Sequence, residues 1–155
     1  MLMISKELNK ALERNGIFIN FNLPLDIIEN RKDKILKIYR KKRYEDVNEV
    51  LIDFLCFFLD KELLFINKIS YPDSMHFKLK NALTITYAVK TIENDFNLTG
   101  LIPFGALHRD HMILFIDKND SVYASMDNIL IHFGINPFDA LTNILNHKQL
   151  ERVEI

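Results

Sequence analysis

The sequence predicts a single α+β domain over residues 1–155, in which helices cover a mostly antiparallel, mixed sheet. Apolar residues recur at helical spacing through the first third of the chain, and short apolar segments separated by turn residues follow, including two adjacent hairpins. Hydrophobic residues make up 48% of the chain and charged residues 26%, as in ordinary globular domains. No internal repeat and no linker rich in Pro, Gly or Ser divides the chain.

Three helices are expected in the first part of the chain. The first is short and ends at Asn15-Gly16, and its apolar face is Ile4, Leu8, Ala11 and Leu12. The second begins near Leu25-Asp26, turns Lys34, Lys37 and Lys41 outward, and faces inward with Ile27, Ile28, Ile35, Ile38 and Tyr39. The third begins around Glu45-Asp46, and its outer face carries Asp53 and Asp60. Its apolar face is the expected hydrophobic centre of the fold and consists of Val47, Val50, Leu51, Phe54, Leu55 and Phe58.

Strands and two further helices are expected after residue 60. Apolar segments at 63–69 and 75–77 flank a turn at 70–73 and predict two strands. Helical spacing returns at 82–96, and three strands follow at 101–107, 112–116 and 121–124, with turns at 108–110 and 118–120. Asn136 is a good N-cap, Pro137 suits the first helical position and Asp139 the first turn, so the last helix begins here.

Charge and cysteine usage narrow the range of partners and compartments. The formal net charge is −1, which provides no overall field to attract nucleic acid or an anionic membrane, and neither is expected as a direct partner. Cys56 is the one cysteine and lies in the apolar run 54–59, so no disulfide forms within the chain and a buried, inert thiol is expected. The N-terminus reaches the charged Lys6 too early for a signal peptide, which predicts a cytoplasmic protein.

No pattern of catalytic or metal-binding residues stands out. The tripeptide His108-Arg109-Asp110 resembles the start of a protein-kinase catalytic loop, but Phe115 stands where that loop has asparagine, so a hairpin turn is expected. Neither a cysteine nor a third histidine lies near His108 and His111 to complete a metal site. Carboxylates that could pair for acid–base work are explained more simply by turns and caps: Asp95, Asp110, Asp117, Asp120 and Asp127. We therefore expect no enzymatic activity, no metal and no cofactor.

A basic run covers residues 31–43, with eight basic residues against one acidic residue. One interpretation is a nucleic-acid contact. The interpretation we prefer is a solvated helix face, because no aromatic interleaving accompanies the charge and late cations favour a helix C-terminus.

The C-terminal third resembles the SUKH superfamily over roughly residues 99–146. The runs that carry the resemblance are 101–105, 111–117, 120–124 and 133–141, and they are most similar to the third SUKH subfamily. Residues 61–63 depart from the family pattern, which has a Gly-Leu turn there. The resemblance extends distantly to the Smi/Knr family of cell-wall regulators.

The resemblance implies a SUKH-like domain that binds and neutralises a cognate bacterial polymorphic toxin, in most cases a nuclease or deaminase. It implies no catalytic residues. The motif positions Pro103, Gly105 and Tyr123 also have a structural interpretation: Pro103 and Gly105 shape a tight start to a strand, and Tyr123 packs with its hydroxyl free to find a partner.

The charge distribution suggests where a toxin would bind. Residues 1–78 carry 14 basic and 12 acidic residues, whereas residues 79–155 carry 6 and 9. The acids of the second half gather at hairpin turns, and a toxin that acts on nucleic acid needs a basic groove. The predicted partner-binding residues are Asp110, Asp117, Asp120 and Asp127.

Two alternative functions stay open. A regulatory or scaffolding module acting on an endogenous partner would fit the resemblance to cell-wall regulators. A small enzyme would require a deep pocket with convergent polar groups.

Overall fold

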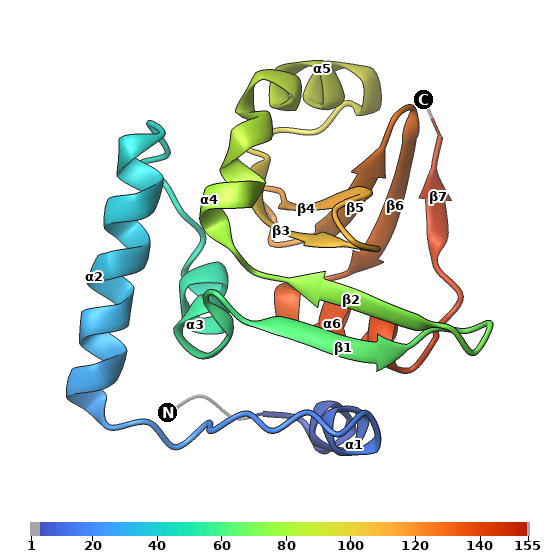
Figure 1. The fold of residues 1–155 in the computed structure, drawn as a ribbon. Coiled ribbons are helices and arrows are strands. Elements are labelled where there is room, and N and C mark those ends of the chain that lie inside the picture. The colour runs from blue at the N-terminus through green and yellow to red at the C-terminus, as the bar shows by residue number, and fades with distance from the viewer. Residues whose placement is uncertain (1–3, 155) are drawn as a thin grey trace.

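The computed structural model describes residues 4–154, and their strands form one open sheet with the order β1-β2-β3-β4-β5-β6-β7 (Figure 1). Every neighbouring pair among the described strands is antiparallel, so the predicted α+β class with a mostly antiparallel sheet is confirmed, and no parallel pair makes this sheet mixed. Tight turns join four of the consecutive pairs, whereas the helix-containing residues 77–101 connect β2 to β3 and residues 135–150 connect β6 to β7. The strands are β1 Glu62–Ile66, β2 Pro72–His76, β3 Ile102–Leu107, β4 Met112–Ile116, β5 Val122–Met126, β6 Ile129–Gly134 and β7 Glu151–Val153.

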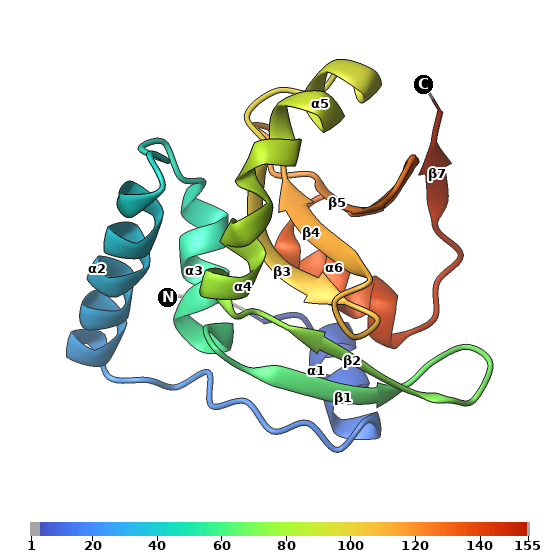
Figure 2. The same ribbon diagram turned by 45° about the horizontal axis from the view of Figure 1, so that its top comes forward.

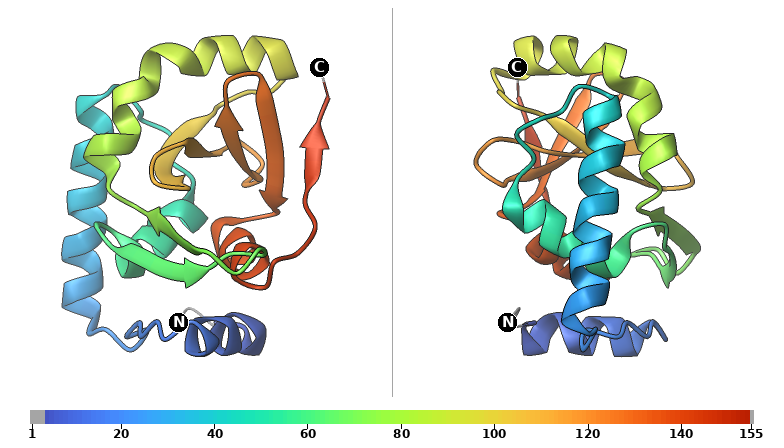
Figure 3. Two further views of the ribbon diagram at one scale, coloured as in Figure 1. Left: turned by 45° about the vertical axis from the view of Figure 1, so that its right-hand side comes forward. Right: turned by 90° about the vertical axis from the view of Figure 1, so that its left-hand side faces the viewer.

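Helices cover both faces of this sheet. They are α1 Lys6–Arg14, α2 Leu25–Lys41, α3 Glu49–Phe58, α4 Leu79–Ala82, α5 Thr86–Phe96 and α6 Pro137–Leu145, with the 3₁₀ turn η1 Leu83–Ile85 between α4 and α5. The larger core joins α1, α2, α3 and α6 to one face of the strands, and a smaller cluster packs α5 on the other face. Figure 2 shows α6 behind the strands, and Figure 3 shows α1 and α5 at opposite ends of the molecule with α2 between them.

Side chains cap the N-termini of the first and last helices, and the end of the first helix at Asn15-Gly16 and the start of the last at Asn136 are as predicted. The Ser5 hydroxyl accepts a hydrogen bond from the Leu8 N–H (3.1 Å), and α1 ends at Asn15, followed by Gly16 with a φ of 67°. The Asn136 carboxamide accepts from the Asp139 N–H (2.9 Å), and Pro137 occupies the first turn of α6. These local capping groups satisfy N–H groups that a helix end leaves unpaired, and so the boundaries follow from short-range sequence.

Helices α2 and α3 pack against each other, with two differences from expectation. Helix α3 begins at Glu49 instead of near Glu45, because Asn48 is held outside the helix by hydrogen bonds from its Nδ2 to the Asp117 carbonyl (2.9 Å) and the Asp120 carboxylate (2.7 Å). Ile27 was expected to face inward but is exposed. The 17 residues of α2 exceed the 10 of α3, which leaves part of α2 uncovered.

The first hairpin has a different turn from the predicted one. Residues 67–71 form it, because the Asn67 side chain accepts from the N–H groups of Ile69 (3.1 Å) and Tyr71 (3.0 Å), an arrangement typical of Asx turns. Pro72 therefore begins β2 instead of lying in the turn.

Two strands were missing from the expected set. Strand β6 has no simple alternation of buried and exposed residues, and β7 is three residues long. Their formation depends on hydrogen bonds to strands already in place, which a local pattern does not encode.

Candidate partner-binding site

The first strand of the sheet has an open edge. Phe77 N donates to Lys61 O (3.0 Å) and Asn67 N donates to Tyr71 O (2.8 Å) at the two ends of the β1–β2 pair. Hydrogen-bonded and non-hydrogen-bonded positions alternate in an antiparallel pair, so Leu63 and Phe65 bond to β2. The backbone N–H and C=O groups of the alternate residues, Glu62, Leu64 and Ile66, therefore point away from β2. They form an unpaired row at the sheet edge, because β1 has a single neighbour among the strands of residues 4–154.

The same residues expose apolar side chains. Leu64 is 68% exposed and Ile66 50%, while Leu63 and Phe65 between them are buried. Ile69 and Tyr71 at the tip of the hairpin are also exposed. Natural sheets usually protect an edge with charge, proline or a covering segment, and concentrated exposed apolar side chains mark interaction sites. We call Leu64, Ile66, Ile69 and Tyr71 with the backbone of β1 the edge surface.

An extended segment borders the edge surface without closing it. Ile17, Ile19, Phe21 and Leu23 pack toward the larger core, whereas Phe18 between them is 88% exposed. Within residues 4–154, no backbone hydrogen bond joins residues 17–23 to β1. A hollow of about 370 Å³ separates residues 15–19 from residues 61–64. The backbone groups of the edge are thus available, with Phe18 beside them.

The structure does not bring the four predicted acidic residues together. Asp110 and Asp127 lie in turns at one end of the β3–β6 strands, and Asp117 and Asp120 lie at the other. Asp117 is only 6% exposed, and its Oδ1 accepts from the N–H groups of Asn119 (2.8 Å) and Ser121 (3.1 Å). Its position therefore gives it a role in the turn, whereas Asp110 and Asp127 are exposed.

Asp110 lies near the edge surface. The Nδ1 atom of buried His76 accepts from the Lys78 N–H (3.1 Å), so its Nε2 carries the proton and donates to Asp110 (2.5 Å). His76 is opposite Glu62 in the β1–β2 register. Glu62 in turn pairs with Lys78 (3.2 Å). Carboxylates thus flank one end of the edge surface.

Asp127 belongs to a separate groove. It lines a hollow of about 470 Å³ between α5 and strands β4 and β5, together with Asp95 and His111. Ile92, Phe96 and other apolar residues form its floor. This groove places one predicted acid beside apolar surface, although far along the sheet from β1.

The motif residues have structural contacts. Tyr39, which is fully buried, donates its hydroxyl to the Pro103 carbonyl (2.8 Å). A Cβ atom on Gly105 would lie 2.5 Å from the His76 carbonyl oxygen, so only glycine fits there. Tyr123 packs its ring against His132 with centroids 5.2 Å apart, and burial, followed by the charge of Asp117, raises the pKa of its hydroxyl. These contacts support the structural interpretation of all three positions.

The basic run divides into paired and exposed residues. Arg31 donates to the Cys56 carbonyl (2.6 Å), Lys32 pairs with Asp53 (3.8 Å) and Lys34 with Asp60 (3.8 Å), which ties the start of the run to α3 and the residues after it. The later cations are exposed at the C-terminal end of α2, where they complement the helix dipole: Lys37, Arg40, Lys41, Lys42 and Arg43.

The residues considered for chemistry lie in ordinary surroundings. The tripeptide 108–110 forms the β3–β4 turn, as predicted, and all three residues have positive φ. His108 Nδ1 bonds to the Asp73 carboxylate, and His108 and His111 line different hollows. Among residues 4–154 no group of three or more His, Cys, Asp or Glu side chains is arranged to hold a metal ion. Cys56 is buried as expected, and burial raises the pKa of its thiol.

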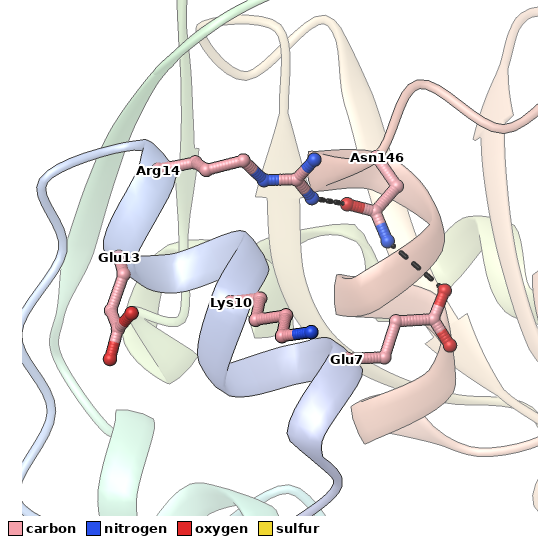
Figure 4. Close-up of a pocket in the computed structure, with 5 residues that line it drawn as sticks. All are labelled: Glu7, Lys10, Glu13, Arg14 and Asn146. Carbon is pink, nitrogen blue, oxygen red and sulfur yellow. Dashed lines mark hydrogen bonds between the residues drawn. The ribbon is translucent and has the colours of Figure 1, made fainter.

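A charged hollow lies on the outside of α1 (Figure 4). Arg14 donates to the Asn146 carboxamide oxygen, and the Asn146 amide donates to Glu7 (3.2 Å), while Glu13 points away from both. These groups satisfy one another and tie α1 to the end of α6, so the hollow has a structural explanation.

The edge surface was not predicted from the sequence. Its signal is the run 62–66, in which apolar residues occupy both faces of a strand that begins the sheet. In the described part of the chain, no helix is both long and apolar enough to cross a membrane. No protein-family model matches this sequence, and no curated protein or solved structure is significantly similar to it. The SUKH assignment therefore stays a prediction from the residues that carry the resemblance.

Proposed function

We propose that this chain is a cytoplasmic immunity protein that binds and neutralises a cognate toxin, and that the edge surface is its principal contact. The single observation that carries the binding function is the coincidence, on Leu64 and Ile66, of unpaired backbone groups with exposed apolar side chains. Unpaired backbone groups and exposed apolar side chains each favour aggregation of a free protein. A partner that covers the edge pairs the backbone groups and buries the side chains.

The edge favours a particular mode of binding. An extended segment of the partner adds a strand beside β1 and pairs with the outward N–H and C=O groups of Glu62, Leu64 and Ile66. Backbone pairing supplies affinity, and the alternate side chains of the added strand meet Leu64 and Ile66, which supplies specificity. Phe18 and the tip residues Ile69 and Tyr71 extend the apolar contact.

The identity of the partner class rests on the resemblance described above. A SUKH-like domain encoded beside a polymorphic toxin protects the producing cell by occluding that toxin, and this role requires no catalytic group. Toxins that act on nucleic acid are basic, so Glu62 and Asp110 beside the edge surface would favour their approach.

Co-expression tests the proposal directly. If a gene for a toxin with a nuclease-like domain lies immediately upstream, as the resemblance implies, that toxin is expressed with and without this protein, and growth and pull-down are scored. We expect growth rescue and a stable complex for the wild type, and loss of both for the variant Leu64→Lys. Toxicity that this protein leaves unchanged would reject the immunity function, and a complex that Leu64→Lys leaves intact would reject the edge surface.

A further inference from the structure

A second site lies on the opposite side of the β1–β2 hairpin from the edge surface. A cavity of about 300 Å³ opens between the hairpin tip, strand β6, the C-terminal end of α6 and the segment that leads to β7. The hairpin tip and this segment lie side by side in Figures 1 and 2. The volume is at the lower end of the range for small-molecule sites, so a small ligand fits it.

The cavity combines an apolar floor with a basic rim. Phe65, Met112, Phe133 and Ile144 contribute to the floor, and the side chains of the first three are buried in the sheet. The rim carries Lys68 on one wall and His147 and Lys148 on the other, with His108 beside them. No Asp or Glu residue is among those that line it. The ionisable residues that line the cavity are therefore all basic, and they surround an apolar space.

His108 is held in a defined orientation. Its Nδ1 bonds to the carboxylate of Asp73, which is buried behind the cavity and also accepts from the Ser74 N–H (2.8 Å). Within residues 4–154 no hydrogen bond to His108 Nε2 is formed, so this nitrogen is available to a ligand. The Asp73 carboxylate fixes the orientation of the ring in the wall of the cavity.

The end of α6 does not oppose an anion at this place. A helix C-terminus carries partial negative charge on its unpaired carbonyl groups. Here the Asn143 carbonyl accepts from the Lys148 N–H (3.0 Å) and the Ile144 carbonyl from the His147 N–H (3.2 Å). The same turn that caps the helix thus carries His147 and Lys148 to the rim.

We propose that this cavity binds a small amphipathic carboxylate, such as a medium-chain fatty acid anion. The apolar body of the ligand occupies the floor, and its carboxylate lies at the mouth between Lys68 and Lys148, within reach of His108. A neutral ligand would leave the basic rim unused, and a small inorganic anion would leave the floor unfilled. The inference does not rest on toxin binding: the cavity shares Ile69 at the hairpin tip with the edge surface, but neither Leu64 nor Ile66 lines it.

Binding is tested on the full chain with octanoate, 1-octanol and acetate, measured by calorimetry and by amide chemical shifts in NMR spectra. Octanoate is expected to bind about tenfold more tightly than 1-octanol, because it adds two ion pairs, and acetate is expected not to bind measurably. The shifts should gather at residues 65–69, 107–112 and 143–150. Equal affinity for octanoate and 1-octanol, no octanoate binding, or shifts elsewhere would each overturn the proposal.

Matched lysine variants separate the site from the general surface. The pair Lys68→Gln and Lys148→Gln removes rim charge at exposed positions, so the fold is kept, and the preference for octanoate over 1-octanol should fall to about twofold or less. The control pair Lys80→Gln and Lys90→Gln removes the same charge from α4 and α5, and should keep the preference. An equal effect of the two pairs would show non-specific attraction and reject the site.

Discussion

Tyr39 on α2 donates a hydrogen bond of 2.8 Å to the carbonyl oxygen of Pro103 on β3. The tyrosine is fully buried, so the bond connects an outer helix to the sheet without water in between. Burial, the larger cause, and the charge of the neighbouring Tyr44 both hold the pKa of the Tyr39 hydroxyl well above its ordinary value.

Tyr39→Phe should lower the free energy of unfolding by about 1 to 2 kcal/mol at neutral pH, because the Pro103 carbonyl loses its partner. Below about pH 10 the tyrosine is protonated in both folded and unfolded chains, and its contribution is fully present. Above that pH the unfolded chain releases the proton first, so stability falls as the pH rises toward the raised pKa. Urea unfolding in alkaline buffers should show a smaller loss for Tyr39→Phe than for the wild type.

The pKa values of Tyr44 and Tyr123 are also raised by burial, so they add an alkaline loss of the same sign in both proteins. The comparison with Tyr39→Phe therefore isolates one residue. An identical alkaline slope in the two proteins would contradict the assignment.

Gly105→Ala should destabilise the protein by about 1 to 3 kcal/mol or more, because the new Cβ would lie 2.5 Å from the His76 carbonyl oxygen and 3.0 Å from the Phe77 ring. Gly16→Ala is the control. Gly16 has a φ of 67° and no neighbouring atom within 4 Å, so only backbone strain of about 1 kcal/mol is expected. Thermal unfolding ranks the two, and a larger effect at Gly16 would contradict the close approach of β2 and β3.

Leu64→Lys or Ile66→Lys should weaken toxin binding at least about tenfold, because each places a charge in the centre of the proposed apolar contact. Both side chains are exposed in the free protein, so the unfolding temperature should change little. Ile135→Lys is the matched control, since Ile135 is as exposed as Leu64 (68% each) but lies between β6 and α6, outside the edge surface. Calorimetric titration with an inactivated toxin provides the measurement.

Mutation of Asp117 and of Asp127 should change different properties, stability for the first and association rate for the second, although the sequence predicts the same binding role for both. Asp117→Ala should cost about 1 to 3 kcal/mol of stability, because the Asn119 and Ser121 N–H groups lose their acceptor. Asp127→Asn should leave stability almost unchanged, since Asp127 is exposed and asparagine tolerates its positive φ of 52°. It should instead slow association with a basic toxin at low salt.

Chemical denaturation and stopped-flow association at two salt concentrations measure these effects. The difference in association rate should disappear at high salt, where charges are screened. A loss of stability in Asp127→Asn that matches that of Asp117→Ala would contradict the distinct roles.

Local sequence determined the elements whose information is short-range. As predicted, Asn136 caps the last helix, Gly16 follows the first helix with positive φ, and Leu51, Phe54, Leu55 and Phe58 of the α3 stripe are buried. Likewise residues 108–110 form the predicted turn between two strands. These features depend on hydrogen bonds and spacing within a few residues, so they can be read without a fold.

Tertiary structure alone decided the rest. It separated Asp117 from Asp127, paired Asp73 with His108, and left β1 at the edge with Leu64 and Ile66 exposed. Strand order, register and burial arise from contacts between residues far apart in the chain, and the same apolar strand is core at the centre of a sheet and surface at its edge. For this reason the acids could be named from the sequence, whereas the surface that the proposed function uses became visible only once the sheet was assembled.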